Sequence, residues 1–323
     1  MMIWYSAFIF DNNWEYKFNI PKRSSPHMNV LQRLYEITGL PALPEIMVKI
    51  QHIVNSEEGD AQLLAKIIEQ DLSLTAKVLK VANSAFFSAG NKRISSLPIA
   101  IARIGFNEIR SITMAITLIK QLSKKSNYID YRAFWRHSLS AAYLTQTIAA
   151  MLNKKLSNEE LQFCFLAGLL HDMGILIYDQ YFHREFEQIM EYAIKQEKSF
   201  LTAEQVIAGK ATHQMVGSAL LETWKIDLPI ISGVRFHHSF DKAPGHHLTC
   251  AAIVYLAEYI LCNWAVGSFE GTINEINAGV WDLLKISPDA LGDIFAKTEM
   301  EVEKADIILA MEVGEKSSNL RLV

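Results

Sequence analysis

Leu161–Tyr181, with the sequence LQFCFLAGLLHDMGILIYDQY, is the stretch that most constrains the fold. From Phe163 to Tyr178 it is apolar on every side except at His171 and Asp172, and a helix that is apolar all round is buried in the middle of a protein. A buried carboxylate without a partner costs several kcal/mol or stays protonated. Asp172 therefore needs a partner, which is either a metal ion or a hydrogen bond to the adjacent His171.

The length and composition are those of a globular protein with a large core. The chain has 323 residues, of which 50% are hydrophobic and 20% charged, so we expect one large domain with additions, or two domains. A net charge of -4 and short, isolated basic pairs such as Lys124-Lys125 do not favour nucleic-acid binding. The first residues lack the basic start and the small-residue cleavage site of a signal peptide. No run is long and pure enough to span a bilayer.

The cysteines indicate the compartment. Cys164, Cys250 and Cys262 are far apart and lie in apolar helical runs, which is typical of buried free thiols in a reducing environment. We therefore expect a cytoplasmic protein that does not associate with membranes.

The first 29 residues differ from the rest of the chain. Ile3–Phe10 and Trp14–Ile20 are rich in aromatic and β-branched residues and flank Asp11-Asn12-Asn13, which is typical of a turn. The sequence therefore predicts a small β-hairpin followed by a linker over residues 1–29. From Val30 onward apolar residues recur at helical spacing and no stretch has the sustained alternation of a strand, so we predict an all-α body.

This body is predicted to have three parts, which are residues 30–130, 131–265 and 266–323. The middle part holds a long helix over Tyr131–Leu152 and an apolar helix over Leu248–Trp264, and the last part holds an amphipathic helix over Leu291–Met311. Asp71 and Thr212 precede apolar helical runs and are predicted to cap them.

Seven ionisable side chains are embedded in apolar helical runs or lie at their ends: His137, His171, Asp172, His213, His237, His238 and Glu258. Imidazole and carboxylate together suit divalent transition metals such as Fe, Mn, Zn or Ni. Any one of these histidines is more often a hydrogen-bonded core residue than a ligand, but seven such groups in a chain with 10 histidines favour a metal centre. His246-His247 lies in a Pro-Gly loop and is assigned to solvent or to local hydrogen bonds.

The order of these groups resembles that of the HD superfamily of metal-dependent phosphohydrolases. His171-Asp172-Met173-Gly174 is similar to its HD-x-G segment, and the lone His213, the pair His237-His238 and the final acid Glu258 follow in the same order. Residues 40 to 260 are similar to the HDOD domain, a bacterial signalling relative of the HD fold; the signatures are Leu40–Pro44, Ile68–Leu74, Val81–Phe87, Ile99–Gly105 and Trp135–Ser138.

This resemblance implies an HD-domain-like helical bundle and a regulatory role in bacterial signal transduction. The expected partner is a signalling protein or a small nucleotide ligand, and the sequence leaves a homodimer open. The seven residues would hold one or two metal ions with Asp172 between them. The alternative is a metal-dependent phosphohydrolase, that is, a phosphodiesterase acting on a nucleotide or cyclic dinucleotide with Asp172 as its catalytic residue.

Three differences separate the chain from the active cyclic-dinucleotide phosphodiesterases of the HD superfamily. Ile175 stands where those relatives have a lysine, their Gly-Tyr-Pro signature after the histidine pair is absent, and Glu258 replaces their final aspartate. The missing lysine removes a cation that could hold a scissile phosphate, whereas a glutamate is still a competent ligand. The differences favour the regulatory role over hydrolysis and leave open whether the protein is an enzyme.

Overall fold

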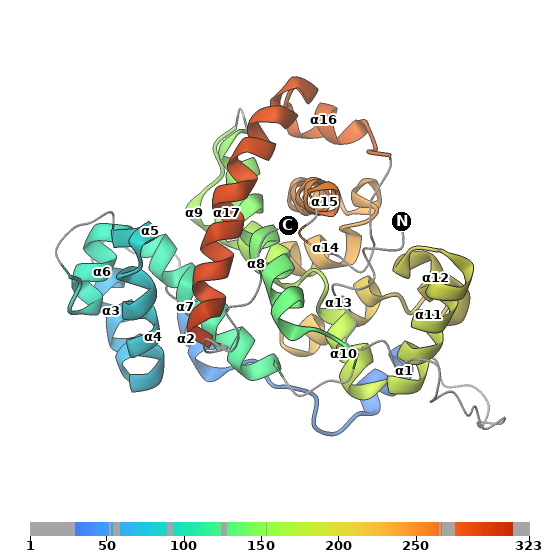
Figure 1. Cartoon of the computed structure of the whole chain (residues 1–323), viewed down its shortest axis with the longest axis horizontal. Coiled ribbons are helices and arrows are strands. Elements are labelled where there is room, and N and C mark those ends of the chain that lie inside the picture. The colour runs from blue at the N-terminus through green and yellow to red at the C-terminus, as the bar shows by residue number, and fades with distance from the viewer. Residues whose placement is uncertain are drawn as a thin grey trace, which may run out of the picture.

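The computed structural model of the chain describes residues 30–51, 53, 59–88, 93–123, 128–152, 154–264, 266 and 275–312. Every regular element within these ranges is a helix (Figure 1). The prediction of an all-α body is therefore confirmed for the described residues. The β-hairpin predicted for residues 1–29 lies outside them.

The helices follow one another along the chain as α1 Val30–Glu36, α2 Glu45–Gln51, α3 Gly59–Glu69, α4 Leu72–Ala82, α5 Ala85–Ser88, α6 Leu97–Ile104, α7 Phe106–Leu122, α8 Tyr131–Ala150, α9 Asn158–Leu170, α10 Met173–Tyr181, α11 His183–Gln196, α12 Phe200–Ile207, α13 His213–Thr223, α14 Leu228–Phe236, α15 Leu248–Asn263, α16 Gly279–Leu284 and α17 Leu291–Glu312. Two 3₁₀ turns lie at Phe240–Lys242 and Pro288–Ala290.

Helices α2 to α7 pack on one another at one side of the molecule (Figure 1). The predicted cap of α4 is confirmed, because the Asp71 carboxylate accepts a hydrogen bond of 3.0 Å from the backbone N–H of Leu74. Such a cap satisfies one of the four N–H groups that a helix start leaves without an intrahelical partner. Helix α1 lies apart from this group and packs against α13.

The other side of the molecule is built on α8, α9, α14 and α15, which pack against one another, with α10 packed against α13. The long helix predicted from Tyr131 and the apolar helix predicted from Leu248 both begin at those residues. In α15 almost every residue from Cys250 to Cys262 is buried, as expected for a helix without a polar face. These helices hold the candidate site in their middle.

The central stretch forms two helices, so the prediction of one continuous helix is wrong. Helix α9 starts at a capping box between Ser157 and Glu160 and ends at Leu170, and α10 starts at Met173. The chain turns at His171 and Asp172 between them. The prediction that no run is long and apolar enough to cross a membrane is wrong by length and composition, because residues 158–181 are such a segment within the described ranges. However, 89% of its most apolar window is buried in the fold.

Helix α17 connects the two sides. It packs along α8 and also contacts α4 and α7, and it is the long red helix beside α8 in Figure 1. Its Asp306 carboxylate accepts two hydrogen bonds from the guanidinium of Arg136 on α8, at 2.8 and 3.1 Å. The predicted C-terminal helix is therefore confirmed, and it lies against the residue that precedes His137.

Candidate metal centre

Seven side chains from different parts of the chain meet at one place among α8, α9, α13, α14 and α15. His137 is on α8, His171 and Asp172 lie in the turn between α9 and α10, His213 is the first residue of α13, His237 and His238 follow α14, and Glu258 is on α15. All are buried except His238, which is half-buried. The structure thus brings together every residue that the sequence predicted for this site.

The first group of three consists of His137, His171 and Glu258. The Nε2 atoms of His137 and His171 are 3.1 Å apart. The Oε2 atom of Glu258 lies 2.9 Å from Nε2 of His137 and 3.2 Å from Nε2 of His171. One nitrogen or oxygen of each side chain therefore points to a common position.

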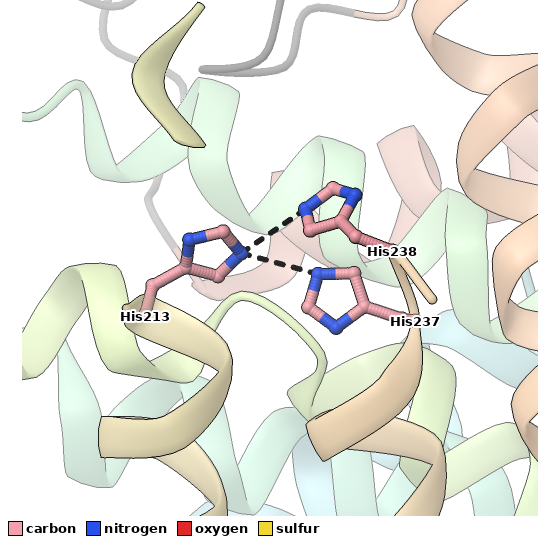
Figure 2. A group of neighbouring side chains, drawn as sticks. All are labelled: His213, His237 and His238. Carbon is pink, nitrogen blue, oxygen red and sulfur yellow. Dashed lines mark hydrogen bonds between the residues drawn. The ribbon is translucent and has the colours of Figure 1, made fainter. Parts of the chain in front are cut away.

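The second group of three is His213, His237 and His238, drawn in Figure 2. The Nε2 atom of His213 is 3.1 Å from Nε2 of His237 and 3.2 Å from Nε2 of His238. The three imidazoles come from two helix ends and point toward one another (Figure 2).

Asp172 lies between the two groups. Its Oδ2 atom is 3.3 Å from Nε2 of His171 and 3.6 Å from Nε2 of His137. Its Oδ1 atom is 3.6 Å from Nε2 of His213 and 3.7 Å from Nε2 of His237. Each carboxylate oxygen of Asp172 thus faces one group, which is the position of a bridging ligand.

Acceptors behind the imidazoles determine which ring nitrogen carries the proton. The Nδ1 atoms of His171 and His237 lie 2.7 Å from the backbone oxygens of Gly168 and Val234. A carbonyl oxygen can only accept, so in both rings Nδ1–H donates and Nε2 keeps a lone pair when the ring is neutral. Partners of this kind orient metal-binding histidines.

Glu204 has the same role for His213 and was not singled out from the sequence. Its Oε2 atom accepts from Nδ1 of His213 at 2.7 Å, and its Oε1 atom accepts the backbone N–H of His213 at 2.9 Å. Thr212 occupies the N-cap position but makes no capping bond through its side chain, so the predicted cap is wrong and Glu204 of α12 supplies it. Phe200, Ala203 and Glu204 are the buried residues of α12, and this helical spacing was the available signal.

A second missed residue is Cys262, one helical turn after Glu258. Its thiol donates to Oε1 of Glu258 at 2.9 Å, which leaves Oε2 directed at the imidazoles. The i, i+4 spacing of the two residues places them on one face of a helix, so the sequence did contain the relation. The prediction that all three cysteines are buried free thiols is confirmed.

The contact between the imidazoles of His213 and His237 needs a proton or a metal ion between them. When Glu204 is ionised and both rings are neutral, each ring donates through Nδ1 and the two Nε2 lone pairs face each other across 3.1 Å. Such a contact requires a cation, either an additional proton or a metal ion. A proton bridges only two atoms, whereas His238 and Asp172 also direct ligand atoms to this position.

The distances fit a shared ion. Two ligand atoms bound to one metal at about 2.1 Å are about 3.0 Å apart at a right angle and about 3.4 Å apart at a tetrahedral angle. The distances within the two groups, from 2.9 to 3.2 Å, lie in or next to this range. Nitrogen and carboxylate oxygen together suit Zn, Fe, Mn and Ni, so the residues present fit the expected cofactor.

The protonation equilibria differ between the two groups. Burial lowers the pKa of His237 well below its usual value, and it lowers the pKa of His238 to about 3, in both cases together with neighbouring imidazoles. Burial also acts on His171, but the carboxylates of Asp172 and Glu258 outweigh it and raise the pKa of this imidazole well above its usual value. His237 and His238 therefore offer neutral imidazoles, the form that binds a metal, and the carboxylates of Asp172 and Glu258 make the position beside His171 attractive to a cation.

The pKa values of the two carboxyl groups are lowered, although burial by itself would raise them. The charge of His171 lowers the pKa of Asp172, and His137 and His171 lower that of Glu258. Both side chains are therefore carboxylates near neutral pH, which is the form that metals bind.

Gly174 allows the close contact on which the site depends. A Cβ atom at this position would lie 1.9 Å from the backbone oxygen of His213 and 2.8 Å from its Cα atom, far closer than any real contact. Since α10 begins just after Asp172 and α13 begins at His213, the absence of this side chain lets the two ligands approach. This is the glycine of the HD-x-G segment, and the structure supplies its physical reason.

Comparison with known sequences identifies the same family. The sequence model of the HDOD domain matches residues 40–240. Among curated proteins, the chain is 25% identical over 223 residues to an uncharacterized protein of Treponema pallidum (strain Nichols), and the match covers 68% of this chain and 42% of that protein. The chain spans less than half the length of the curated relatives it matches.

Solved structures share the fold. An HDOD domain protein of unknown function from Geobacter sulfurreducens superposes with a TM-score of 0.74 at 24% identity, covering 87% of this chain and 95% of that one. A protein of Shewanella amazonensis SB2B, provisionally named a metal-dependent phosphohydrolase, has a TM-score of 0.54 at 21% identity and covers 85% of this chain and 95% of that one. At these identities the likeness shows the fold alone. Because the family match takes in more than half of the sequence, the chain belongs to the HDOD domain family.

Proposed function

We propose that this chain is a regulatory protein of signal transduction whose HD-like centre binds one or two divalent transition-metal ions. His137, His171 and Glu258 would hold one ion, and the imidazoles of the second group would hold the other. Asp172 would bridge them through its two oxygens. The candidate metals are Fe, Mn, Zn and Ni.

The observation that carries this proposal is the opposed pair of Nε2 atoms in His213 and His237. With Glu204 ionised, the acceptors behind both rings favour the same tautomer, and 3.1 Å then separates two lone pairs. A metal ion bound here would relieve this repulsion, and the other ligand atoms that converge there would hold it. A buried His-Asp hydrogen bond, the alternative left open by the sequence, accounts for the Asp172 carboxylate but not for this contact.

The second candidate function is metal-dependent phosphohydrolysis. It is supported by the arrangement of two ligand groups on either side of one carboxylate, and by the likeness in fold to the Shewanella amazonensis protein with that provisional name. Metal ions in such a site, when bound, lower the pKa of a water molecule and polarise a phosphoryl oxygen. The residues of this chain would position the ions, with Asp172 as the candidate catalytic residue.

Ile175 is the reason for placing regulation first. Its side chain is apolar and only 1% exposed, and it stands where the hydrolytic relatives have a lysine. The chain therefore lacks at this position the cation that would bind a scissile phosphate. Our proposal also includes a bacterial, cytoplasmic protein with a signalling protein or small nucleotide as partner, and the division of its body at residues 130 and 265.

Metal analysis of the purified protein tests the proposal. We expect the wild-type chain to retain one to two equivalents of transition metal, and His213→Ala to lose at least one of them because His213 contacts both other imidazoles of its group. His183→Ala is the matched control, since His183 is an exposed histidine at the start of α11. Wild-type protein that contains no metal, binds none on addition and has the same melting temperature with and without a chelator would contradict the proposal.

The same preparations separate the two candidate functions. Hydrolysis of bis(p-nitrophenyl) phosphate by the metal-loaded wild type, lost in Asp172→Asn, would establish the second candidate. Metal-loaded protein without hydrolytic activity would support the regulatory function.

A further inference from the structure

A cavity of about 400 Å³ lies at the opposite ends of the helices that carry the candidate metal ligands. Its walls come from the residues after α8, the first turns of α9, α14 and α15, the loop before α15, and the end of α16. A volume of this size is within the range of small-molecule sites.

The cavity is separate from the metal centre. Cys164 and Cys250 line it. Cys164 precedes His171, the residue just after α9, by seven residues, and Cys250 precedes Glu258 on α15 by eight. At 1.5 Å per helical residue, this corresponds to roughly 10 to 12 Å along the helix axes. A ligand of moderate size in the cavity would therefore not contact the seven candidate metal ligands.

One part of the cavity is cationic. Lys154 and Lys285 line it, and the N-terminus of the 16-residue helix α15 lies beside them. The residue at the N-cap of α15, His247, makes no capping bond through its side chain. First-turn N–H groups and the helix dipole attract anions, and the two lysines add full positive charges to the same region.

His247 lies in the same wall of the cavity and is partly exposed. Burial and the neighbouring His246 lower the pKa of its imidazole, while a hydrogen bond with the backbone of His246 acts in the opposite direction. The assignment of His246-His247 to solvent or local hydrogen bonds agrees with the structure, in which His246 is exposed. Both rings also lie in the wall of this cavity, with centroids 3.9 Å apart.

The other part of the cavity is apolar. Leu156, Phe163 and Leu284 contribute to it, and their side chains suit a planar or aliphatic group. Glu160 also lines the cavity, but its carboxylate accepts the N–H of Ser157 at 2.8 Å in the capping box of α9. The hydrogen bond from Ser157 and the charge of Lys154 both lower the pKa of Glu160, so part of the charge of Lys154 is balanced by this carboxylate. The lining still holds two lysines against one carboxylate.

We propose that this cavity binds a small organic phosphate with a planar or apolar body, of about the size of a mononucleotide. The phosphate accepts hydrogen bonds from the first turn of α15 and pairs with Lys154 and Lys285. The body packs against Phe163 and its apolar neighbours. This makes the cavity a ligand site of the protein that is distinct from the candidate metal centre.

Isothermal titration calorimetry of the full-length protein tests the proposal, with the four ribonucleoside 5′-monophosphates, adenosine and inorganic phosphate as probes. We expect at least one monophosphate to bind saturably at one site, about tenfold or more tighter than adenosine or phosphate alone. The double variant Lys154→Ala/Lys285→Gln should weaken this binding about tenfold or more, since it removes two charged partners of the phosphate. Lys155→Ala is the matched control, because Lys155 is equally exposed and does not line the cavity.

Three results would overturn the proposal. The first is that none of the four monophosphates binds at concentrations up to about 5 mM, which corresponds to a negligible affinity. The second is equal weakening by the double variant and by Lys155→Ala. The third is complete loss of binding in Asp172→Ala, which would locate the ligand at the metal centre.

Discussion

Gly174→Ala is the most informative single substitution. The added Cβ atom would collide with backbone atoms of His213, which cannot rotate away as a side chain could. The new Cβ atom would lie 1.9 Å from the carbonyl oxygen of His213, so the start of α10 and the start of α13 must separate by about 1.5 Å to reach an ordinary contact of 3.4 Å. Overpacking of a core costs about 1 to 3 kcal/mol. Alanine also lowers the conformational entropy of the unfolded chain, which stabilises the folded state by up to about 1 kcal/mol and offsets part of this cost.

We therefore expect Gly174→Ala to lower the free energy of unfolding by about 2 kcal/mol, measured by urea denaturation of the metal-free protein. The effect on metal binding should be larger, since a site tolerates displacements of only about 0.5 Å. The displaced residue is His213, which contacts both other imidazoles of its group. Competition with a fluorescent chelator should show at least about a tenfold loss of metal affinity. Substitutions of residues that support a metal ligand lower the affinity by about 10- to 100-fold, and we expect at least the lower value.

Gly292→Ala is the control for this experiment. Its added Cβ atom would meet nothing within 4 Å in the first turn of α17, so stability and metal affinity should be unchanged or slightly improved. If Gly174→Ala behaves like this control in both measurements, the close approach of α10 and α13 does not hold the site together, and our account of the HD-x-G glycine is wrong.

Three other substitutions test the surroundings of the site and the packing of α17. Glu204→Ala removes both acceptors of His213 and should cost about 2 kcal/mol in urea denaturation and lower metal affinity tenfold or more; an unchanged affinity would contradict the role of Glu204. On α17, Asp306→Asn should cost less than about 1 kcal/mol because its ion pair with Arg136 is partly exposed, whereas Ile308→Ala, at a fully buried position, should cost about 2 to 4 kcal/mol. If Asp306→Asn lowered the free energy of unfolding more than Ile308→Ala, the ion pair and not apolar burial would hold α17 against the rest of the fold.

The sequence is informative about the site because a charged side chain in an apolar helix costs free energy unless it has a partner. Asp172 in an apolar run requires a partner whatever the fold, and the same reasoning singles out Glu258. The structure places both carboxylates among the imidazoles. The sequence spacing of these residues does not say which of them lie together, because they are far apart in the chain. Only the structure shows that His137 and Glu258 share one group and that His213 belongs to the other.

Local patterns also had limits where tertiary contacts dominate. Thr212 has the right residue type and position for an N-cap, yet Glu204 from another helix supplies the acceptor. Residues His171 and Asp172 are compatible with a continuous helix by composition, but the chain turns there and α10 packs against α13. In both cases a contact between distant segments outweighs the local preference.

The amino-acid sequence by itself determined that the body is helical, that Leu161–Tyr181 lies at its centre, and which seven ionisable side chains lie in or next to its apolar helices. These follow from apolar periodicity and from the free-energy cost of burying charge, both of which are local properties. Only the tertiary structure decided that the central stretch breaks at His171 and Asp172, that Asp172 lies between two groups, and that Glu204 and Gly174 hold His213 in place. These depend on how closely helices distant in sequence approach one another, and that distance is set by packing of the whole core.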